Sequence, residues 1–305
     1  MIDTQAFCGL TTTKSPFIEN AQKDGKLFIH QPYELYNEDN QEAWKQLYTQ
    51  LQSKWERFAN TKFLQGINSL CLRPDRIPTL EEVNVFLEPL SGFKATAVSG
   101  YVPTFLFFDS LKNRNFPTTI TIRDSQTLNY LPEPDIFHDI AGHVPMHTDK
   151  TFADVLVKIG SLAEVARNRH AHLTNSKEKR EKIRNNLQAL ARFFWFTVEF
   201  GLMRENGRIC VYGSGLLSSA DEIVHAITSP EVQRYPFQLE WVINQSFEID
   251  RFQPLLFIIE SFEHLYETIG QLEAWLLSGR LDSVSPGEPE ISNDDLQVFL
   301  HASPS

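Results

Sequence analysis

The stretch EPDIFHDIAGHVPMHTD, residues 133–149, gathers chemically active side chains in an otherwise ordinary globular sequence. It holds three histidines and four acidic residues among apolar neighbours. His138 and His143 lie five residues apart, and on a regular α-helix this spacing turns two side chains roughly 140° away from each other. A shared site therefore requires a distorted or ending helix. Gly142 and Pro145 flank the second histidine and supply the means to break helical regularity.

The histidine pair by itself allows more than one interpretation. It is not the HExxH arrangement of zinc proteases, in which a spacing of four places both imidazoles on one helical face. On spacing alone, two ordinary histidines, exposed or satisfied by hydrogen bonds, are the favoured interpretation of His138 and His143.

Glu199 changes this balance because it lies in the apolar segment ARFFWFTVEFGLM. Its helical neighbours at three and four residues are apolar: Trp195, Phe196, Leu202 and Met203. An ionised carboxylate in such surroundings is costly unless a cation compensates it. A distant arginine is one candidate, and a metal ion held by two neutral imidazoles is another. Two histidines and one carboxylate form the facial triad of non-haem Fe(II) oxygenases.

Helical periodicity dominates the rest of the chain. Apolar residues recur at spacings of three and four in the segments 41–59, 80–90, 152–166, 187–202 and 253–277. Strand candidates are short and isolated, at 26–31, 94–100, 118–124 and 208–213. No internal repeat is visible, so a solenoid or propeller is disfavoured. We therefore expect a mainly α fold with small β-ribbons and no central sheet.

Composition limits the class of protein. The 305 residues include 42% hydrophobic residues, enough for a sizeable core. A net charge of −11 opposes attachment to nucleic acid or anionic lipid. The three cysteines are scattered without a CxxC pair, and neither a signal peptide nor an apolar run of membrane-spanning length is present. These features favour a cytoplasmic protein.

Two polar stretches stand apart from this pattern. The segment 174–186, TNSKEKREKIRNN, is charged and largely basic, and we expect an exposed loop or helix start with a solvated face. The segment 281–305 contains Pro, Ser and acidic residues, and we expect a loosely held tail. Neither stretch suggests a chemical role.

Three blocks of the sequence resemble the tetrahydropterin-dependent aromatic amino acid hydroxylases, and most of all the short bacterial phenylalanine 4-hydroxylases. The blocks are NYLPEPDIFHDIAGHVPM, FWFTVEFGL and VYGSGLLSS, and the likeness extends over roughly residues 28–275. The resemblance implies the catalytic-domain fold of that family, a helical basket with small peripheral β-ribbons. It also implies Fe(II) and a tetrahydropterin as cofactors, with O₂ as co-substrate.

The resemblance assigns a role to individual residues around the iron and the pterin. His138, His143 and Glu199 match the iron ligands, in agreement with the chemistry above. Asp135 matches a carboxylate that orients a ligating imidazole. The cofactor-binding candidates are Gly100, Val102, Phe107, Asp139 and Phe194. Of these, Phe107 is expected to stack on the pterin ring, Asp139 stands where other members carry Glu, and Phe194 replaces a common Tyr.

On the amino acid side, Arg123 matches the arginine that binds the substrate carboxylate, and Ser218 a hydroxyl that assists it. Trp195 and Pro134 match walls of the aromatic pocket, and Glu222 a supporting polar residue. By spacing alone, Trp195 and Phe107 are better explained as core aromatics, so these roles rest on the resemblance.

The resemblance implies one catalytic domain, 28–280, between an N-terminal extension, 1–27, and the polar tail, 281–305. No regulatory domain or heptad-bearing helix is recognisable, so we expect a monomer or weak dimer that acts on small molecules. The implied reaction is hydroxylation of a free aromatic amino acid, phenylalanine to tyrosine in the first place. Tyrosine or tryptophan hydroxylation, a zinc hydrolase and a non-catalytic binding protein stay open as alternatives.

Overall fold

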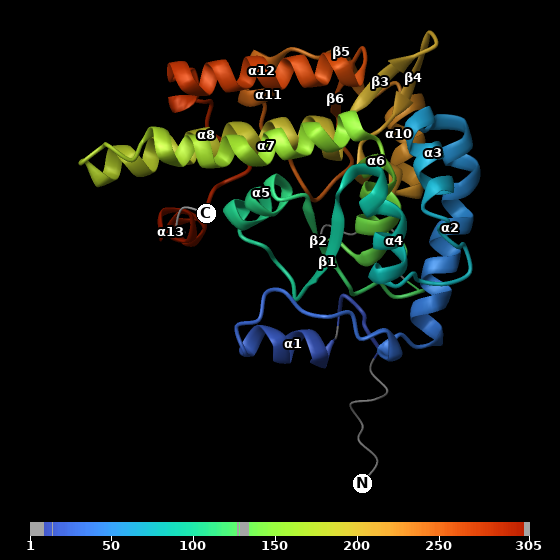
Figure 1. Cartoon of the computed structure of the whole chain (residues 1–305). Helices are drawn as coiled ribbons and strands as arrows, with labels where there is room; N and C mark the ends of the chain where they lie inside the picture. Colours follow the sequence, from blue (N-terminus) through green and yellow to red (C-terminus); the bar gives the residue numbers. More distant parts are fainter. Residues whose placement is uncertain (1–8, 14, 127, 129–133, 302–305) are drawn as a thin grey trace.

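Figure 1 shows the computed structural model of the chain, which describes residues 9–13, 15–126, 128 and 134–301. Its α-helices are α1 (Pro16–Lys23), α2 (Glu38–Phe58), α3 (Thr61–Ser69), α4 (Leu80–Ser91), α5 (Thr104–Lys112), α6 (Val144–His147), α7 (Lys150–Arg169), α8 (Ser176–Phe194), α9 (Ser214–Leu217), α10 (Ala220–Thr228), α11 (Leu239–Asn244), α12 (Phe262–Ser278) and α13 (Asn293–His301). The strands are β1 (Lys94–Val98), β2 (Asn115–Thr119), β3 (Leu202–Glu205), β4 (Arg208–Val211), β5 (Gln233–Pro236) and β6 (Leu255–Ile259). No helix in this part of the chain combines the length and apolar character needed to cross a bilayer.

The long helices α7 and α8 cross the middle of the molecule and pack against each other (Figure 1). Helices α11 and α12 lie on one side of them, and α5 with the strands β1 and β2 lies on the other. Helices α2 and α3 flank one end, while α1 lies beyond the β1–β2 pair (Figure 1). This basket of helices with two small sheets confirms the predicted fold class.

Local sequence signals set the ends of several helices. Asn37 and Asn40 form a reciprocal capping box at the start of α2, and Thr79 and Glu82 form another at the start of α4. Helix α4 ends at Gly92, which adopts a left-handed conformation with φ of 77° that an L side chain disfavours. The charged segment 174–186 forms the first turns of α8, and most of its residues are exposed or half-buried, as predicted.

The strands differ in part from the prediction. Strand β2 ends at Thr119, inside the expected strand 118–124, and pairs in parallel with β1. The second sheet has the order β4-β3-β6-β5. We expected one helical stripe over 253–277, but its first part is β6. A short, continuously apolar run is compatible with a buried strand or a buried helix, so periodicity could not separate them.

The N-terminal segment packs against the domain that follows it. Leu10 is fully buried, and its N–H donates to the side chain of Asn40 at 3.1 Å. Main-chain bonds join Thr12 N to Ile122 O at 3.0 Å and Ile122 N to Leu10 O at 2.8 Å. Residues 1–8 of the predicted extension, including Cys8, lie outside the described residues.

The C-terminal segment is packed, in contrast to the loose tail that we expected. Leu281, Ile291 and Leu296 are buried. Arg192 of α8 is fully buried, and its guanidinium donates to the carbonyl oxygens of Ser285 and Gly287, each at 2.8 Å, and of Glu288 at 2.9 Å. A buried arginine on another helix binds the tail through main-chain carbonyls. The polar composition of the tail itself gives no sign of this contact.

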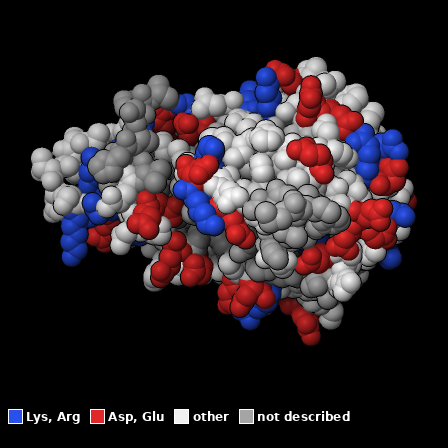
Figure 2. Space-filling view, turned by 90° about the horizontal axis from the view of Figure 1, so that it is seen from below, with Lys and Arg blue, Asp and Glu red and all other residues white. Residues whose placement is uncertain are grey.

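The surface agrees with the negative net charge. On the face seen in Figure 2, Asp and Glu side chains predominate over Lys and Arg. A surface of this sign repels polyanions.

Candidate metal and cofactor site

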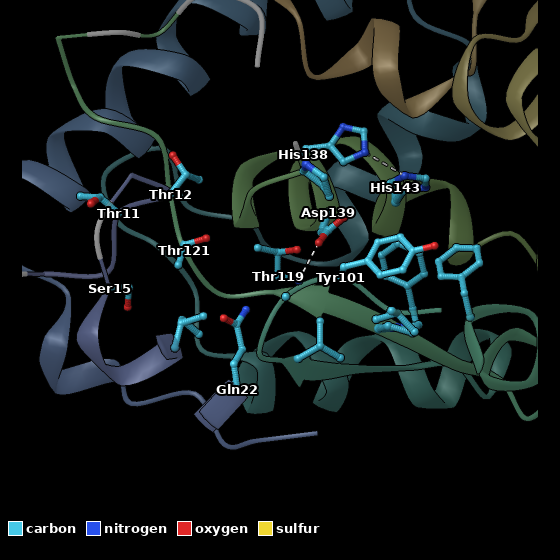
Figure 3. A pocket seen from close by; sticks show the side chains of 18 of the residues that line it. Thr11, Thr12, Ser15, Gln22, Tyr101, Thr119, Thr121, His138, Asp139 and His143 are labelled. Atoms are coloured by element: carbon cyan, nitrogen blue, oxygen red, sulfur yellow. Dashed lines mark hydrogen bonds between the residues drawn. The ribbon is translucent and has the colours of Figure 1, made fainter. Parts of the chain in front are cut away.

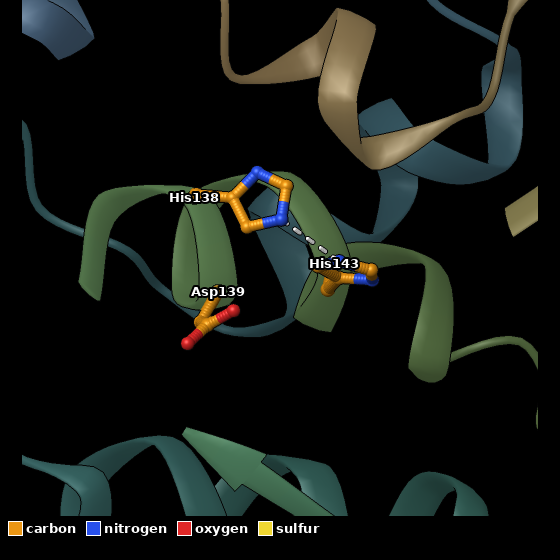
Figure 4. A group of neighbouring side chains, drawn as sticks. All are labelled: His138, Asp139 and His143. Carbon is orange, nitrogen blue, oxygen red and sulfur yellow. Dashed lines mark hydrogen bonds between the residues drawn. The ribbon is translucent and has the colours of Figure 1, made fainter. Parts of the chain in front are cut away.

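Two π-helical turns carry the predicted metal ligands. One turn, η3, spans His138–His143, and the other, η4, spans Trp195–Glu199. In a π-helix each main-chain hydrogen bond spans five residues, as in the bonds from Val144 N to Asp139 O and from Phe200 N to Trp195 O. A residue five positions on therefore lies about one turn further on the same face. This is the distortion that the spacing of the two histidines required (Figure 4).

The donor atoms of His138, His143 and Glu199 converge on one point. The Nε2 atoms of the two imidazoles lie 3.1 Å apart. Glu199 places Oε1 3.0 Å from His143 Nε2 and Oε2 3.6 Å from His138 Nε2. An ion about 2.1 Å from each donor, with bonds at right angles, separates the donors by about 3 Å. The two imidazoles and the carboxylate, each of whose oxygens lies nearer to a different histidine, are therefore spaced closely enough to share one ion.

The charges of these groups also suit a cation. Burial lowers the pKa of His138 to about 4, which keeps this imidazole neutral. Burial opposes the charged form of Glu199, but the two histidines outweigh it and lower the pKa of the carboxyl to about 2. Burial likewise opposes a charge on His143, yet Glu199 outweighs it and raises the pKa of that imidazole. A field that favours a proton at this point also favours a metal ion.

Ser218 fixes the tautomer of His138. Its Oγ lies 2.9 Å from the carbonyl oxygen of Ser214, to which it donates, and 2.8 Å from Nδ1 of His138. A hydroxyl has one proton, so Nδ1–H is the donor in the second contact. The Nε2 lone pair of His138 is then directed at Glu199 and His143. Gly142 permits this approach, since a Cβ there would lie 3.2 Å from the Ser218 Cβ.

The structure differs from the prediction for Asp135. We expected its carboxylate to orient a ligating imidazole, but Asp135 Oδ1 accepts from the main-chain N–H of His138 at 2.9 Å, as a helix N-cap does. The imidazole contact belongs to Ser218, which we expected at the substrate carboxylate. The sequence shows which polar residues are near the histidines but not which of their atoms meet.

Asp139 is a second carboxylate beside the histidines. Among the described residues, His138, Asp139 and His143 also present donor atoms within 4.8 Å of one another. Glu199, in comparison, places one oxygen 3.0 Å from His143 Nε2 and the other 3.6 Å from His138 Nε2. Asp139 is turned toward β2, where its Oδ2 accepts from Thr119 N at 2.6 Å (Figures 3 and 4). Geometry therefore favours Glu199 as the third ligand.

A cavity of about 680 Å³ opens beside the convergent donors (Figure 3). His138, His143 and Glu199 lie in its wall, as do most of the predicted cofactor residues: Gly100, Val102, Phe107 and Asp139. Phe194 is not in this wall but lies behind Phe107, in edge-to-face contact at 5.4 Å between ring centroids. The volume suits a small heterocyclic ligand together with solvent.

Several cavity residues were not predicted. Thr11, Thr12 and Gln22 reach it from the N-terminal segment, and Thr119 and Tyr101 from the β1–β2 region. The hydroxyl-rich run 11–13 is visible in the sequence, but it has no periodicity or motif that would place it at a site.

Ser214, beside the metal ligands, was also not predicted. Its Oγ lies 2.9 Å from both His143 Nε2 and Glu199 Oε2. Ser214 lies four residues before Ser218, and this spacing was the sequence feature that could have indicated its place at the site.

Arg123 forms a buried ion pair with Asp135. Its Nε and Nη2 donate to the carboxylate of Asp135 at 2.7 and 3.0 Å. Burial opposes the charges on both residues, but each holds the pKa of the other in the charged direction. A guanidinium has five N–H donors, so the pair leaves Nη1 and one proton of Nη2 for another carboxylate. Nη1 makes a long contact of 3.5 Å with Leu128 O.

Trp195 is held in a layer of aromatic rings. Its ring stacks on Phe247 at a centroid distance of 3.9 Å and contacts Phe200 at 4.5 Å. Its Nε1–H donates to Gln253 Oε1 at 3.2 Å, and the main-chain N–H of Gln253 donates to Glu222 Oε1 at 2.9 Å. Glu222 therefore supports Trp195 through Gln253. Of the predicted substrate residues, only Pro134 lines the cavity described above.

The buried carboxyl of Glu222 should make the free energy of unfolding depend on pH. It is 1% exposed, and burial raises the pKa of its carboxyl to about 7 from an ordinary value near 4.5. The folded chain then holds a proton that the unfolded chain releases, so this contribution is complete below about pH 4.5 and is lost as the pH rises to about 7. As the pH is raised from 5 to 8, we expect the free energy of unfolding of Glu222→Gln to increase by about 2 to 3 kcal/mol relative to that of the parent.

Urea unfolding at several pH values measures this difference. The amide of the variant does not titrate, so its own hydrogen-bonding cost is the same at each pH. If the two stability curves run parallel, the carboxyl is already ionised in the folded protein.

A model of the biopterin-dependent aromatic amino acid hydroxylase family matches residues 20–276. The chain belongs to this family. Its predicted cofactors, a reduced pterin and iron, agree with the biopterin dependence of the family and with iron in related structures.

Individual relatives place the chain within the family. It is 33% identical to the phenylalanine-4-hydroxylase of Chromobacterium violaceum over 94% of this chain and 91% of that protein. It is 37% identical to that of Caulobacter vibrioides, over 78% and 76% of the two chains. Tyrosine 3-monooxygenase of Rattus norvegicus is 36% identical, over 76% of this chain and 44% of that protein.

Solved structures agree with this placement. The phenylalanine hydroxylase of Chromobacterium violaceum with bound oxidised Fe(III) superposes with a TM-score of 0.75 at 33% identity, over 88% of this chain and 92% of that chain. The structure of that enzyme with iron and phenylalanine bound gives a TM-score of 0.73 at 31% identity, over 88% and 92%.

Proposed function

We propose that this chain is an Fe(II)- and tetrahydropterin-dependent monooxygenase that hydroxylates the ring of free phenylalanine to give tyrosine. The convergence of His138, His143 and Glu199 in the wall of the cavity carries the proposal. Two neutral imidazoles and one carboxylate bind one side of an iron ion and leave the other side open to ligands. Relatives named phenylalanine-4-hydroxylase cover most of the chain and support phenylalanine as the substrate.

In this proposal, iron and the reduced pterin together supply the activation of O₂, and the protein positions the reactants. Phe107 would stack on the pterin ring, Gly100 and Val102 would border its binding site, and the Asp139 carboxyl would lie near the pterin. Phe194 supports the ring of Phe107 from behind.

The amino acid is proposed to lie on the Arg123 side of the metal. The free end of the guanidinium presents two parallel N–H groups to the substrate carboxylate, while Asp135 holds the other edge of the arginine. Trp195 and Pro134 border the aromatic ring, and Glu222 keeps Trp195 in place through Gln253.

The direct test supplies anaerobic protein with Fe(II), tetrahydrobiopterin and phenylalanine, and then admits air. The expected result is tyrosine, formed at a rate that depends on both cofactors. Parallel reactions with tyrosine and tryptophan decide between the family's substrates, and tyrosine hydroxylation is the alternative favoured by the tyrosine 3-monooxygenase relative. Zinc-supported activity without pterin would instead indicate a hydrolase, and pterin binding without any product a non-catalytic binding protein.

Ser218 gives a separate prediction for the metal site. In Ser218→Ala, His138 Nδ1 loses its acceptor, so the imidazole is free to rotate or to carry its proton on Nε2. Groups that support a metal ligand in this way typically contribute 10- to 100-fold to metal affinity, and we expect a loss of about that size for Fe(II). Anaerobic titration measures it, with the exposed Ser278→Ala as control. An unchanged affinity would remove Ser218 from the metal site.

The predicted partners are small molecules, and the predicted assembly is a monomer or weak dimer. The scattered cysteines, of which Cys71 and Cys210 are free in the described residues, support a cytoplasmic location as part of the same proposal.

A further inference from the structure

The C-terminal helix meets the wall of the cofactor cavity through one side chain. Tyr101 lines the cavity (Figure 3), and its hydroxyl donates to Asp295 Oδ1 at 3.0 Å and Oδ2 at 3.2 Å. Asp295, on α13, is 7% exposed, whereas Tyr101 is 74% exposed. The hydroxyl contact with Asp295 therefore restrains an aromatic ring that little else covers.

The same carboxylate lies at the start of α5. Pro103 occupies the N-cap position of this helix and offers no side-chain acceptor, and Thr104 N points to Asp295 Oδ1 at 3.4 Å. Exposed N–H groups at a helix N-terminus favour a nearby anion. Helix α5 carries Phe107, which lines the cavity one turn further on. Asp295 thus contacts Tyr101 and Thr104, and Thr104 lies three residues before Phe107 on the same helix.

Asp295 is itself held in place. Ser292 Oγ donates to Asp295 Oδ2 at 2.8 Å, and Asp295 N donates to Ser292 Oγ at 3.0 Å. The neighbouring Leu296 is fully buried, and Arg192 anchors the chain before the helix through main-chain carbonyls. The position of Asp295 is therefore fixed relative to the core. It lies beyond residue 276, where the family match ends.

We propose that Asp295 is a positioning residue for the pterin, acting through the hydroxyl of Tyr101 and the N-terminus of α5. The proposal rests on the proposed function. It assigns to the C-terminal segment of this chain a role in cofactor affinity. Because Asp295 does not touch the metal ligands or Arg123, its effect should be confined to the cofactor.

The first test compares Asp295→Ala with Asp294→Ala, which removes the same charge from an exposed neighbour on the same helix. In Asp295→Ala we expect KM for tetrahydrobiopterin to rise about 5- to 10-fold, the scale of one ordinary hydrogen bond, because the carboxylate acts on the pterin only through Tyr101 and α5. KM for phenylalanine and iron content should stay unchanged, and Asp294→Ala should match the parent. A role limited to stability would lower the melting temperature without separating the two KM values, and that result would overturn the proposal.

Tyr101→Phe removes only the hydroxyl from an exposed ring and should not affect folding. We expect it to raise KM for the pterin in the same direction, by no more than Asp295→Ala does. The double variant should match Asp295→Ala, since the hydroxyl acts through the same carboxylate. Fully additive effects would mean that Tyr101 and Asp295 act independently and would contradict the proposal.

A binding measurement separates this proposal from the proposed function. Quenching of tryptophan fluorescence by 7,8-dihydrobiopterin reports cofactor binding without turnover. If the parent protein neither binds this pterin nor forms tyrosine, the proposed function fails. If the parent does both and Asp295→Ala binds the pterin equally well, only the role of Asp295 is refuted.

Discussion

Replacing Glu199 by alanine should abolish iron-dependent hydroxylation and leave the fold largely intact. Supporting groups around a metal ligand contribute up to about 100-fold, so loss of a ligand should lower turnover by more than about 100-fold. The fold should survive because Glu199 lies in the wall of the cavity and is partly exposed. His138→Ala and His143→Ala should behave in the same way.

Asp139→Asn is the matched control for this prediction. It neutralises the other carboxylate that lies near both histidines, while its amide oxygen can still accept from Thr119 N. We expect the Asp139 variant to bind about one iron per chain and the Glu199 variant to bind little. Iron content by atomic spectroscopy, beside tyrosine formation, provides the measurement. The assignment of the third ligand is wrong if Glu199→Ala keeps iron and full turnover, or if Asp139→Asn loses the metal.

The histidine spacing shows how far the sequence could predict this site. A separation of five residues excluded a regular helix, and the structure resolves the conflict with a π-helical turn. The identity of that distortion was not predictable, because a glycine, a proline and an ended helix would each break regularity. Gly142 is needed for a different reason than we expected: its lack of a side chain lets Ser218 and Ser214 approach η3.

Contacts between distant segments account for most of what the sequence could not provide. Ser218 lies 80 residues from His138, and no periodic pattern connects them. The part of the cavity wall formed by residues 11–13, residues 15–22 and Tyr101 comes from irregular or short segments, in which side-chain direction is not set by a repeat. By contrast, the long amphipathic helices were predictable, since a sustained apolar stripe has few alternative structures.

Arg123 carries the second large expected effect. A charge-assisted bidentate contact with the substrate carboxylate contributes on the order of 1.5 to 3 kcal/mol. Loss of that contact in Arg123→Ala should lower kcat/KM for phenylalanine by roughly 10- to 150-fold, at 1.36 kcal/mol per decade. We expect KM for phenylalanine to rise and more pterin to be oxidised without hydroxylation, because the carboxylate contact also positions the ring. Iron content should be unchanged.

The ion pair with Asp135 complicates the alanine variant. Asp135 is fully buried, so removing its partner leaves an unpaired carboxylate and is expected to cost about 3 to 5 kcal/mol of stability. Arg123→Lys avoids most of this cost because an ammonium can still neutralise Asp135. It lacks the planar fork for a second carboxylate, so it should recover only part of the activity.

Arg192→Lys controls for the effect of altering a buried arginine, since Arg192 binds main-chain carbonyls away from the cavity. It should reduce stability without changing KM for phenylalanine. The decisive comparison is KM for phenylalanine beside KM for the pterin in Arg123→Lys. A rise in the phenylalanine value alone supports the substrate contact. If KM for the pterin rises and KM for phenylalanine does not, Arg123 does not contact the amino acid carboxylate. It then serves the cofactor or the scaffold.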